Sequence, residues 1–505
     1  MTIGYAYLLD KLATGAFELP VVARVAPVQR IIPTKGREPG NTIMVPSQVA
    51  PRPDATPIDH LLFAMKHEGI EMQQCLLALK KIDSQELQDA IQTAPNSEYV
   101  RRAGYLWEMA NPEKPPLESH VLPTAPYQLL LDPDEHYTSR PKRGEKETKW
   151  RIDFNGLGTR LYCPTVRRTP KLDQLIAWDI LGRVKSFAQS LSVQQLNRIL
   201  RWAYLSETQG SDQLEREATS HNKAERFSQL LSTAGNTRPL SEESLAEIQR
   251  AALTNPLAHA YGYRTEQNWL SNGARGPMGV TYVPPAPELC AQIMDQIEMM
   301  ANDRTSEINP LIASALVSFA VVLAHPFMDG NGRVHRFIFH SQVCSRGGLE
   351  RGLILPISVA MNRHEPEYLA ALESFSKPAR RLWDITRTDA EVQACNFVGD
   401  EIIYRYWDAT ECVTFGVEMA QYALEQDLLQ EHQYLSRHDA VAKTLGKMID
   451  MPGADLNLLV REVLTHGRLS DNRLKQFAAK GYSAQILELA QSTVLQEDRN
   501  TQTAA

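Results

Sequence analysis

Apolar residues recur at intervals of three and four along most of the chain, and this spacing is typical of one face of an α-helix. In the first part of the chain the pattern runs from Ile58 to about Asn111. After Asp173 it predicts helices over 174–190, 192–217, 222–234, 240–252, 286–302, 307–324, 332–346, 364–376, 388–407, 410–430 and 433–450. We therefore expect a mainly α fold, with further helical regions before and after a central bundle.

Three stretches depart from the helical pattern. Residues 20–57 are dense in proline, which removes amide donors and disfavours helix, so they are expected to form an arm or linker with short extended pieces such as Val21 to Val25. Residues 132–150 are charged and rich in turn residues, and indicate an exposed loop. In 268–285 clustered Gly and Asn precede a β-prone run, which predicts a hairpin.

The length of 505 residues corresponds to about three domain-sized units. Shifts in the pattern place the boundaries. We expect an N-terminal arm or linker (1–57), an N-terminal helical module with its charged loop (58–150) and a connecting segment (151–235). A central core domain (236–380) and a C-terminal helical module (381–505) are expected to follow.

Composition narrows the class of protein. The net charge of −7 gives no global field that would attract nucleic acid, so no nucleic-acid partner is expected. The six cysteines form no CxxC pair, which is typical of reduced thiols in a cytoplasmic protein. The longest apolar run, Pro310 to Ala324, is too short to span a bilayer and predicts a buried helix, and the N-terminus lacks the basic region of a signal peptide.

The segment from His325 to Arg336, HPFMDGNGRVHR, stands apart because each residue type suits phosphate chemistry. A buried helix must end near His325, and the next helix begins near Asn331 or Gly332. Gly330 and Gly332 permit a tight turn whose amides, with the positive end of the next helix, form an anion site.

Four side chains of this segment have complementary chemistry. Asp329 suits a hard divalent cation, and His325 titrates near neutrality and suits a general base. Arg333 and Arg336 are three residues apart on a helix, so both project from one side toward phosphate oxygens. Any one of these residues is more often an ordinary helix cap or core residue, but the complete set favours phosphoryl or nucleotidyl transfer.

The stretch HPFMDGNGRVHRF resembles the signature of the Fic family, His-x-Phe-x-(Asp/Glu)-Gly-Asn-Gly-Arg-x-x-Arg, with every fixed position filled. The resemblance implies a Fic-type helical bundle that transfers AMP from ATP to a hydroxyl side chain of a protein. It implies His325 as the general base and Asp329 as the magnesium ligand. The Doc kinase branch lacks the GNGR portion that this chain keeps, which favours AMP transfer over phosphorylation.

The same resemblance implies roles for the rest of the signature. Phe327 packs the loop into the core, and Arg333 supports the phosphates. Arg336 takes the γ-phosphate. The residues implied to bind the α- and β-phosphates are Gly330, Asn331 and Gly332.

Two flanking regions extend the resemblance. The hairpin 268–285 is similar to the family's flap, which aligns the target segment by main-chain pairing. Its implied target-binding residues are Gly279, Val280, Thr281 and Tyr282. Downstream, Asn362 and Tyr368 lie where the family places residues near the adenine, although a Tyr on a helix is more often a core residue.

Many Fic proteins carry an inhibitory helix with the pattern (Ser/Thr)-x-x-x-Glu-(Gly/Asn), whose Glu pairs with the last arginine of the signature. The nearest match here is Ser211 to Glu215, followed by Arg216 in place of Gly or Asn. Glu207 and Glu217 are rival candidates, and Glu68-Gly69 is a weaker one because Ala64 precedes it. A solvated acidic helix end explains Ser211 to Glu215 equally well.

The resemblance leaves alternatives open. The expected function is a protein adenylyltransferase that uses ATP and Mg²⁺ on a target protein or on itself. UMP or phosphocholine transfer, removal of AMP, and a non-catalytic regulatory or binding protein with the Fic fold remain open. Assembly with further copies of the chain also stays open.

Overall fold

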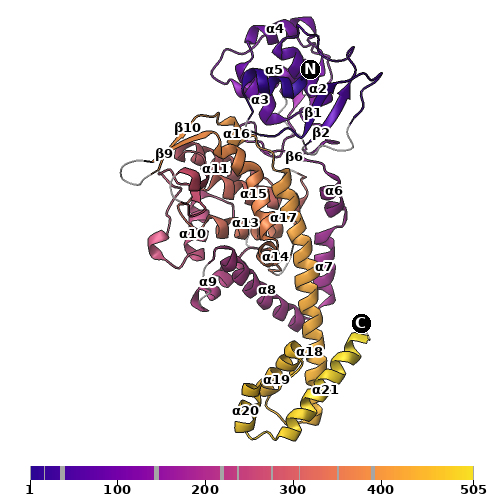
Figure 1. Cartoon of the computed structure of the whole chain (residues 1–505), viewed down its shortest axis with the longest axis vertical. Coiled ribbons are helices and arrows are strands. Elements are labelled where there is room, and N and C mark those ends of the chain that lie inside the picture. Colours follow the sequence, from indigo (N-terminus) through magenta and orange to yellow (C-terminus); the bar gives the residue numbers. More distant parts are fainter. Residues whose placement is uncertain are drawn as a thin grey trace.

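The structure of this 505-residue chain is a computed structural model. It describes residues 2–15, 17–33, 40–140, 147–216, 221–235, 238–274, 277–305, 307–347, 349, 352–387 and 393–503. These residues are mostly helical, with short paired strands, which confirms the expected mainly α fold. An N-terminal module, a central bundle and a C-terminal helical module follow one another along the longest axis of the molecule (Figure 1).

The N-terminal module packs helices around a common core. Its elements are α1 (Gly4–Leu12), α2 (Pro57–His67), α3 (Met72–Lys81), α4 (Ser84–Thr93), α5 (Glu98–Ala110) and the parallel pair β1 (Val21–Val25) with β2 (Asn41–Val45). The expectation that 1–57 is an arm or linker is wrong, because this segment packs against the helices of the module. The hydroxyl of Tyr5 donates to the carbonyl of Gly69 at 2.8 Å, and Ile3 and Val45 are buried with Phe63.

The connecting segment contains short strands and two helices. Strand β3 (Gln128–Leu129) pairs with β5 (Ile152–Asp153), and β4 (His136–Tyr137) pairs with β6 (Val166–Arg167). The single helix expected over 174–190 is two helices, α6 (Pro170–Ala177) and α7 (Ile180–Ser190). Asp179 separates them because its backbone is left-handed, with φ 52°, and its carboxylate caps α7 at the amide of Gly182.

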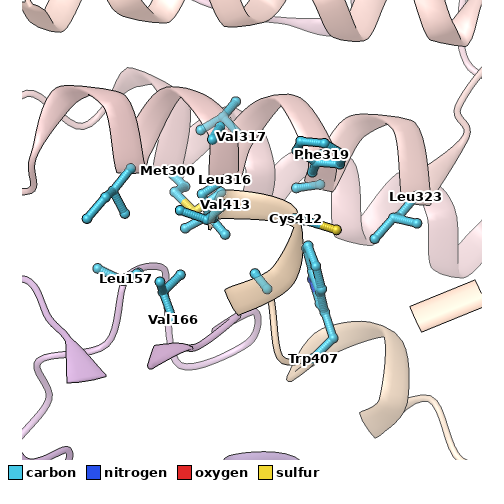
Figure 2. Packing of buried hydrophobic residues seen from close by; sticks show 14 of the residues in the cluster. Leu157, Val166, Met300, Leu316, Val317, Phe319, Leu323, Trp407, Cys412 and Val413 are labelled. Carbon is cyan, nitrogen blue, oxygen red and sulfur yellow. The ribbon is translucent and has the colours of Figure 1, made fainter. Parts of the chain in front are cut away.

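The central bundle surrounds α12, whose apolar side chains are buried on nearly all sides. Its elements are α8 (Val193–Leu214), α9 (His221–Ser232), α10 (Glu242–Ala252), η1 (Pro256–Ala258), α11 (Pro287–Asn302), α12 (Pro310–Ala324), α13 (Asn331–Gly347), α14 (Ile357–Arg363) and α15 (Glu365–Arg380). Leu316 and Phe319 of α12 pack toward Cys412 and Val413 of α17 (Thr410–Tyr422) (Figure 2). The run Pro310 to Ala324 therefore forms the buried helix that the sequence predicts.

Two hairpins lie against each other beside the bundle. Strand β7 (Leu270–Ser271) pairs with β8 (Val280–Tyr282), with η2 (Pro277–Gly279) between them, which confirms the expected hairpin, although residues 275–276 lie outside the described part. The helix expected over 388–407 is wrong. This region instead contains strand β10 (Gln393–Phe397), which pairs with the preceding strand β9 (Trp383–Arg387), and the short helix α16 (Ile402–Arg405). Residues 388–392 lie outside the described part. Trp383 is buried there with Val280 and Val283.

The C-terminal region begins with three helical elements that follow one another without a break. Helix α17 continues through the π-helical η3 (Ala423–Leu428) into α18 (Leu429–Met448). Helices α19 (Gly453–His466), α20 (Asp471–Ala479) and α21 (Ala484–Thr503) pack against the end of α18 around a separate core that contains Leu445, Val460 and Phe477 (Figure 1). None of the helices in the described residues combines the length and apolarity needed to cross a membrane.

Candidate functional site

The loop between α12 and α13 is shaped by unusual backbone angles and by one side chain. His325 ends α12 in the left-handed region, with φ 52°, and Gly330 has φ 85°. The Asn331 carboxamide closes the loop: its Oδ1 accepts from the Phe327 amide at 3.0 Å, and its Nδ2 donates to the Phe327 carbonyl at 2.7 Å. Phe327 is completely buried, so its ring fixes the loop to the core.

His325 is held by two residues that the sequence analysis did not select. The guanidinium of Arg264 donates to the His325 carbonyl at 2.9 Å. Asn268 Nδ2 lies 3.0 Å from His325 Nδ1 and 3.2 Å from the Phe327 carbonyl. Because that carbonyl only accepts, Nδ2 is the donor and Nδ1 of His325 acts as an acceptor.

The surroundings of His325 keep its imidazole neutral. Burial, together with the positive charge of Arg264, lowers the pKa of His325 to about 4. A neutral imidazole has one lone pair, which lies on Nδ1 in this arrangement, so His325 can act as a base at neutral pH when a hydroxyl replaces the Asn268 amide as the donor to Nδ1.

Asp329 is exposed beside this loop. Its Oδ1 accepts from the Gly330 amide at 2.6 Å, and its backbone carbonyl accepts from Gln249 of α10 at 3.1 Å. Within the described residues no group of three or more His, Cys, Asp or Glu side chains is arranged to hold a metal. Asp329 would offer one carboxylate oxygen to a cation at this site, and Mg²⁺ often takes one or two carboxylates with water and phosphate oxygens.

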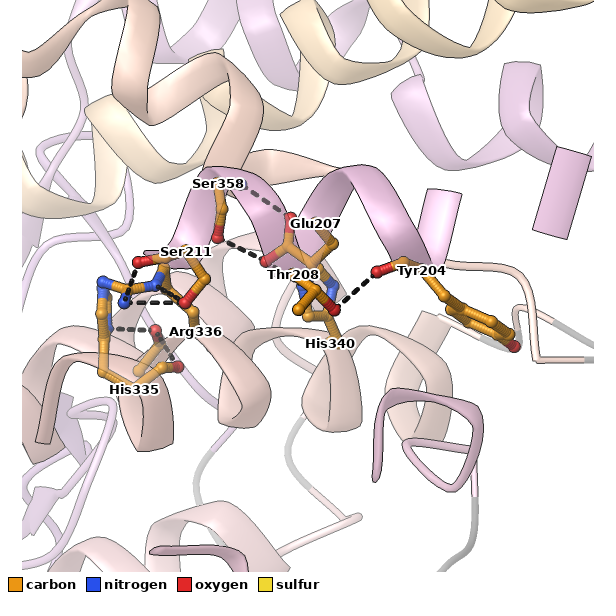
Figure 3. A network of polar contacts seen from close by, with 9 residues as sticks. Tyr204, Glu207, Thr208, Ser211, His335, Arg336, His340 and Ser358 are labelled. Atoms are coloured by element: carbon orange, nitrogen blue, oxygen red, sulfur yellow. Dashed lines mark hydrogen bonds and ion pairs between the residues drawn. The ribbon is translucent and has the colours of Figure 1, made fainter. Parts of the chain in front are cut away.

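Helix α8 brings Ser211 and Glu215 to the arginine at the end of the signature. The buried guanidinium of Arg336 donates to Ser211 Oγ at 3.0 Å from Nε and 2.8 Å from Nη2, and to Glu215 Oε1 at 2.6 Å (Ser211 and Arg336 in Figure 3). The Glu215 carboxylate also lies directly against Gly332, where a Cβ would be 2.2 Å from Oε1. The structure thus places a carboxylate at the part of the loop that is expected to bind phosphate.

The residue after Glu215 explains how the helix ends. Arg216 has φ 55°, the left-handed conformation in which Gly or Asn is the usual residue, and its guanidinium lies 3.6 Å from Glu365. Arg216 therefore does not draw the Glu215 carboxylate away from Arg336. The rival Glu217 lies outside the described residues.

The other signature arginine also faces α8. Arg333 is 2% exposed, and its Nη2 lies 3.4 Å from Asp212 Oδ1. Both arginines of the first turns of α13 therefore contact acidic residues of α8. The expected projection of Arg333 and Arg336 from one side of the helix agrees with this arrangement.

Glu207, the other rival of Glu215, has a structural position that the sequence did not indicate. It is fully buried and accepts from His340 Nε2 at 2.8 Å, from the Ser358 amide at 2.8 Å and from the Ser358 hydroxyl at 2.5 Å (Figure 3). Its carboxylate is thus bonded to His340 and Ser358, which does not favour Glu207 as the rival of Glu215. The hydrogen bonds of Glu207 therefore connect α8 with both α13 and α14.

The two residues expected near an adenine, Asn362 and Tyr368, have different surroundings. Asn362 donates to Gln213 Oε1 of α8 at 2.8 Å. Tyr368 is 8% exposed and stacks with Phe415, with ring centroids 5.6 Å apart, so it belongs to the aromatic core. Burial raises the pKa of Tyr368 to about 12. Contact of these residues with a nucleotide base stays a prediction.

The flap hairpin is hydrogen-bonded to the end of helix α12. The hydroxyl of Tyr282 donates to the Leu323 carbonyl at the end of α12 at 2.6 Å, and Gly279 and Val280 are buried. Thr281 is exposed, with its hydroxyl 3.3 Å from the Leu270 carbonyl. Of the four flap residues expected to meet a target, Thr281 thus presents its side chain to solvent, and contact of all four with a target stays a prediction.

A comparison with protein families identifies this core. A model of the Fic/DOC family matches residues 239–343. This chain carries a Fic domain. The domain contains the loop from His325 to Arg336, whereas Ser211 and Glu215 precede the matched residues.

Curated relatives of the Fic domain include enzymes. Protein adenylyltransferase fic-1 of Caenorhabditis elegans is 32% identical over 135 residues, which are 26% of this chain and 23% of the relative. The Caenorhabditis briggsae protein of the same name is 28% identical over 135 residues, 26% of this chain and 24% of its own length. The matches thus span about a quarter of these relatives. A solved Fic family protein from Desulfovibrio desulfuricans aligns over 64% of this chain and 87% of its own, with 19% identity and a TM-score of 0.40.

Replacing Glu207 with Ala is expected to lower the free energy of unfolding by about 2–4 kcal/mol, because it leaves buried donors of His340 and Ser358 unpaired. Denaturant titration of the whole chain measures the change. The control is Glu225→Ala, which removes an exposed carboxylate from α9 and should change little. Equal stability of the two variants would show that the network does not stabilise α8.

Replacing Asn268 with Asp is expected to raise the pKa of His325, because a carboxylate next to Nδ1 stabilises the imidazolium. In the wild type the folded state resists protonation, so acidification from about pH 6.5 toward pH 4 lowers stability. The variant should lose less stability over this range. An NMR titration of the histidine ring signals reports the pKa, with Asn272→Asp on the exposed flap as control. An unchanged pKa of His325 in Asn268→Asp would contradict the contact.

Proposed function

We propose that this chain is a protein adenylyltransferase that transfers AMP from ATP to a hydroxyl side chain of a target protein or of itself. The names of the curated relatives and the complete signature support this assignment. The observation that carries it is the Glu215 carboxylate, which lies against Gly332 and 2.6 Å from Arg336. A loop that holds one anion in this way has the donors that a phosphate chain requires.

The signature divides the binding of ATP among its residues. The loop amides from Gly330 to Gly332 and the start of α13 suit the α- and β-phosphates, and Arg336 suits the γ-phosphate. Arg333 acts through its contact with Asp212, which fixes the first turn of α13 against α8. The exposed carboxylate of Asp329 would hold Mg²⁺. The ion, when bound, neutralises charge that develops on the phosphates.

The reaction requires one proton transfer. The hydroxyl oxygen of the target forms a bond to the α-phosphorus, the bond from that phosphorus to the bridging oxygen breaks, and pyrophosphate leaves. His325 takes the proton of the hydroxyl, because its imidazole is neutral at pH 7. Arg264 and Asn268 hold the backbone and ring of His325 in position.

The same geometry supports restraint of this activity by Glu215. Its carboxylate occupies donors of Arg336 that the γ-phosphate needs, so carboxylate and phosphate compete. ATP bound without these donors would have its α-phosphate displaced, and a misplacement of about 1 Å costs on the order of 10²-fold in rate.

Replacing His325 with Ala is expected to lower AMP transfer by about 10²–10⁴-fold and to leave ATP binding nearly unchanged, because the side chain serves the hydroxyl and not the nucleotide. Incubation with ATP labelled separately at the α- and γ-phosphate measures the transfer. His120→Ala, which changes an exposed histidine of the N-terminal module, is the control.

The two labels also test the reaction class. AMP transfer retains the α label alone, whereas retention of the γ label would show a kinase. No incorporation from either label by the wild type and by a variant freed of Glu215 would favour the non-catalytic alternative. Wild-type turnover in His325→Ala would remove His325 from the mechanism.

Replacing Glu215 with Gly is expected to raise AMP incorporation by about 10-fold or more, because it frees Arg336 for the γ-phosphate. The matched control is Arg216→Gly, which changes the next residue and keeps the carboxylate, so it should stay near the wild-type rate. Incorporation by Glu215→Gly no higher than by wild type would overturn the inhibitory role and leave the catalytic one intact.

A further inference from the structure

Helix α10 places a buried glutamine against the loop between α12 and α13. Gln249 is completely buried, and its side chain reaches the backbone of Asp329 in that loop. It lies 76 residues before His325 and outside the signature, and the proposed reaction assigns it no role. A buried polar side chain is almost always hydrogen-bonded, so its partners show which segments it holds together.

The hydrogen bonds of Gln249 fix the orientation of its carboxamide. Nε2 donates to the carbonyl of Ala258 at 2.7 Å and to the carbonyl of Asp329 at 3.1 Å. Oε1 accepts from the amide of Ala260 at 2.9 Å. The reverse orientation would place Oε1 against two carbonyl oxygens, so Nε2 is the atom that faces Asp329. The side chain thereby joins the segment after α10 to the loop of the signature.

The bond to the Asp329 carbonyl also sets the direction of the next amide. The peptide between Asp329 and Gly330 is planar and trans, so its C=O and N–H groups point in opposite directions. Since Gln249 holds the carbonyl, the Gly330 amide points away from the Gln249 side chain, and it donates to Asp329 Oδ1 at 2.6 Å. Under the proposed function this amide is the first donor of the phosphate loop.

The sequence of the loop does not fix this direction by itself. Gly330 has φ 85°, and glycine adopts positive and negative φ with similar ease. Rotation of the Asp329–Gly330 peptide would turn its amide to the other side, as in the exchange between type II and type I turns. A side chain cannot prevent the rotation, because a Cβ at Gly330 would lie 3.2 Å from Leu253 Cδ1. The hydrogen bond from Gln249 opposes it.

The first half of the loop is held by other side chains. Arg264 donates to the carbonyl of His325 at 2.9 Å, and Asn331 donates to the carbonyl of Phe327 at 2.7 Å. Gln249 contacts neither His325 nor Phe327 through a hydrogen bond that the structure shows in its described part. The loss of Gln249 is therefore expected to act on the Asp329–Gly330 peptide and to leave His325 in place.

We propose that Gln249 is a positioning residue for the phosphate site. It holds the Asp329–Gly330 peptide in the orientation in which the Gly330 amide can meet a phosphate beside the Asp329 carboxylate. This inference rests on the proposed function and adds to it a residue outside the signature. A peptide that is already oriented lowers the conformational entropy lost when the phosphates bind, so affinity for the phosphates depends on Gln249.

Calorimetry of the full chain with inorganic triphosphate and Mg²⁺ tests this role, with Glu215→Gly as the parent because its phosphate site is free. Adding Gln249→Met keeps the length of the side chain and removes the donor, and should weaken triphosphate by about 10-fold or more. The matched control adds Gln73→Met, which changes a buried glutamine of α3 whose Nε2 donates to the Ile403 carbonyl at 3.3 Å. The control should bind triphosphate as the parent does.

A second measurement separates positioning from a general loss of structure. An NMR titration should show the same pKa of His325 in the parent and in the variant with Gln249→Met, because other side chains hold that residue. A changed pKa would show that the whole loop has moved and would overturn the selective role. If Gln249→Met does not fold, Gln249→Asn decides, since its amide is one methylene too short for Asp329 and should weaken triphosphate likewise.

The remaining outcomes contradict the inference in different ways. Equal affinity of the parent and the variant with Gln249→Met would overturn it and leave the proposed function intact. Equal weakening by Gln73→Met would show that lost stability, and not the Asp329–Gly330 peptide, lowers the affinity. A Glu215→Gly parent that does not bind triphosphate would overturn the phosphate site of the proposed function, and the role of Gln249 with it.

Discussion

The buried guanidinium of Arg336 is the constraint on which the site depends. A charge that is 1% exposed is costly unless opposite charge and hydrogen-bond acceptors surround it. Ser211 and Glu215, at the end of helix α8, supply this charge and these acceptors. Their hydrogen bonds to Arg336 hold α8 against the motif helix α13. The same donors suit phosphate, and under the proposed function the state of the site follows from which anion they hold.

Helix α8 is fixed by more than this ion pair. Glu207 is bonded to His340 and Ser358 two turns before Glu215, and Gly210 approaches α14 so closely that a Cβ would lie 2.7 Å from the Val359 amide. Glu215, by contrast, follows the last helical residue, and its side chain is 32% exposed. Under the proposed function, exchange of carboxylate for phosphate thus requires movement of one side chain and leaves α8 in place.

The sequence predicted the parts of the molecule that depend on local pattern. The run Pro310 to Ala324 and the loop after it combine strong hydrophobicity with glycines and caps, and the structure has both. The resemblance to the inhibitory helix of the Fic family implied that Glu215 meets Arg336, and the structure brings Ser211 and Glu215 to that arginine. The role of each residue stays a prediction.

The rest depended on contacts between distant segments. Arg264 and Asn268 meet His325 from about 60 residues away, and no local signal marks them. The sequence indicated Glu207 only as a rival of Glu215, since a helical pattern does not show that a carboxylate faces inward. The hairpin of β9 and β10 was mistaken for helix because its apolar residues owe their burial to the neighbouring flap.

The most direct test of the competition at Arg336 is the affinity of the site for inorganic triphosphate, which has the charges of ATP without its base. Calorimetry on the wild type and on Glu215→Gly measures this affinity without any transfer reaction. The account predicts that the variant binds triphosphate about 10-fold or more tightly than the wild type, because the carboxylate no longer holds the donors of Arg336. Equal affinity of the two proteins would contradict it.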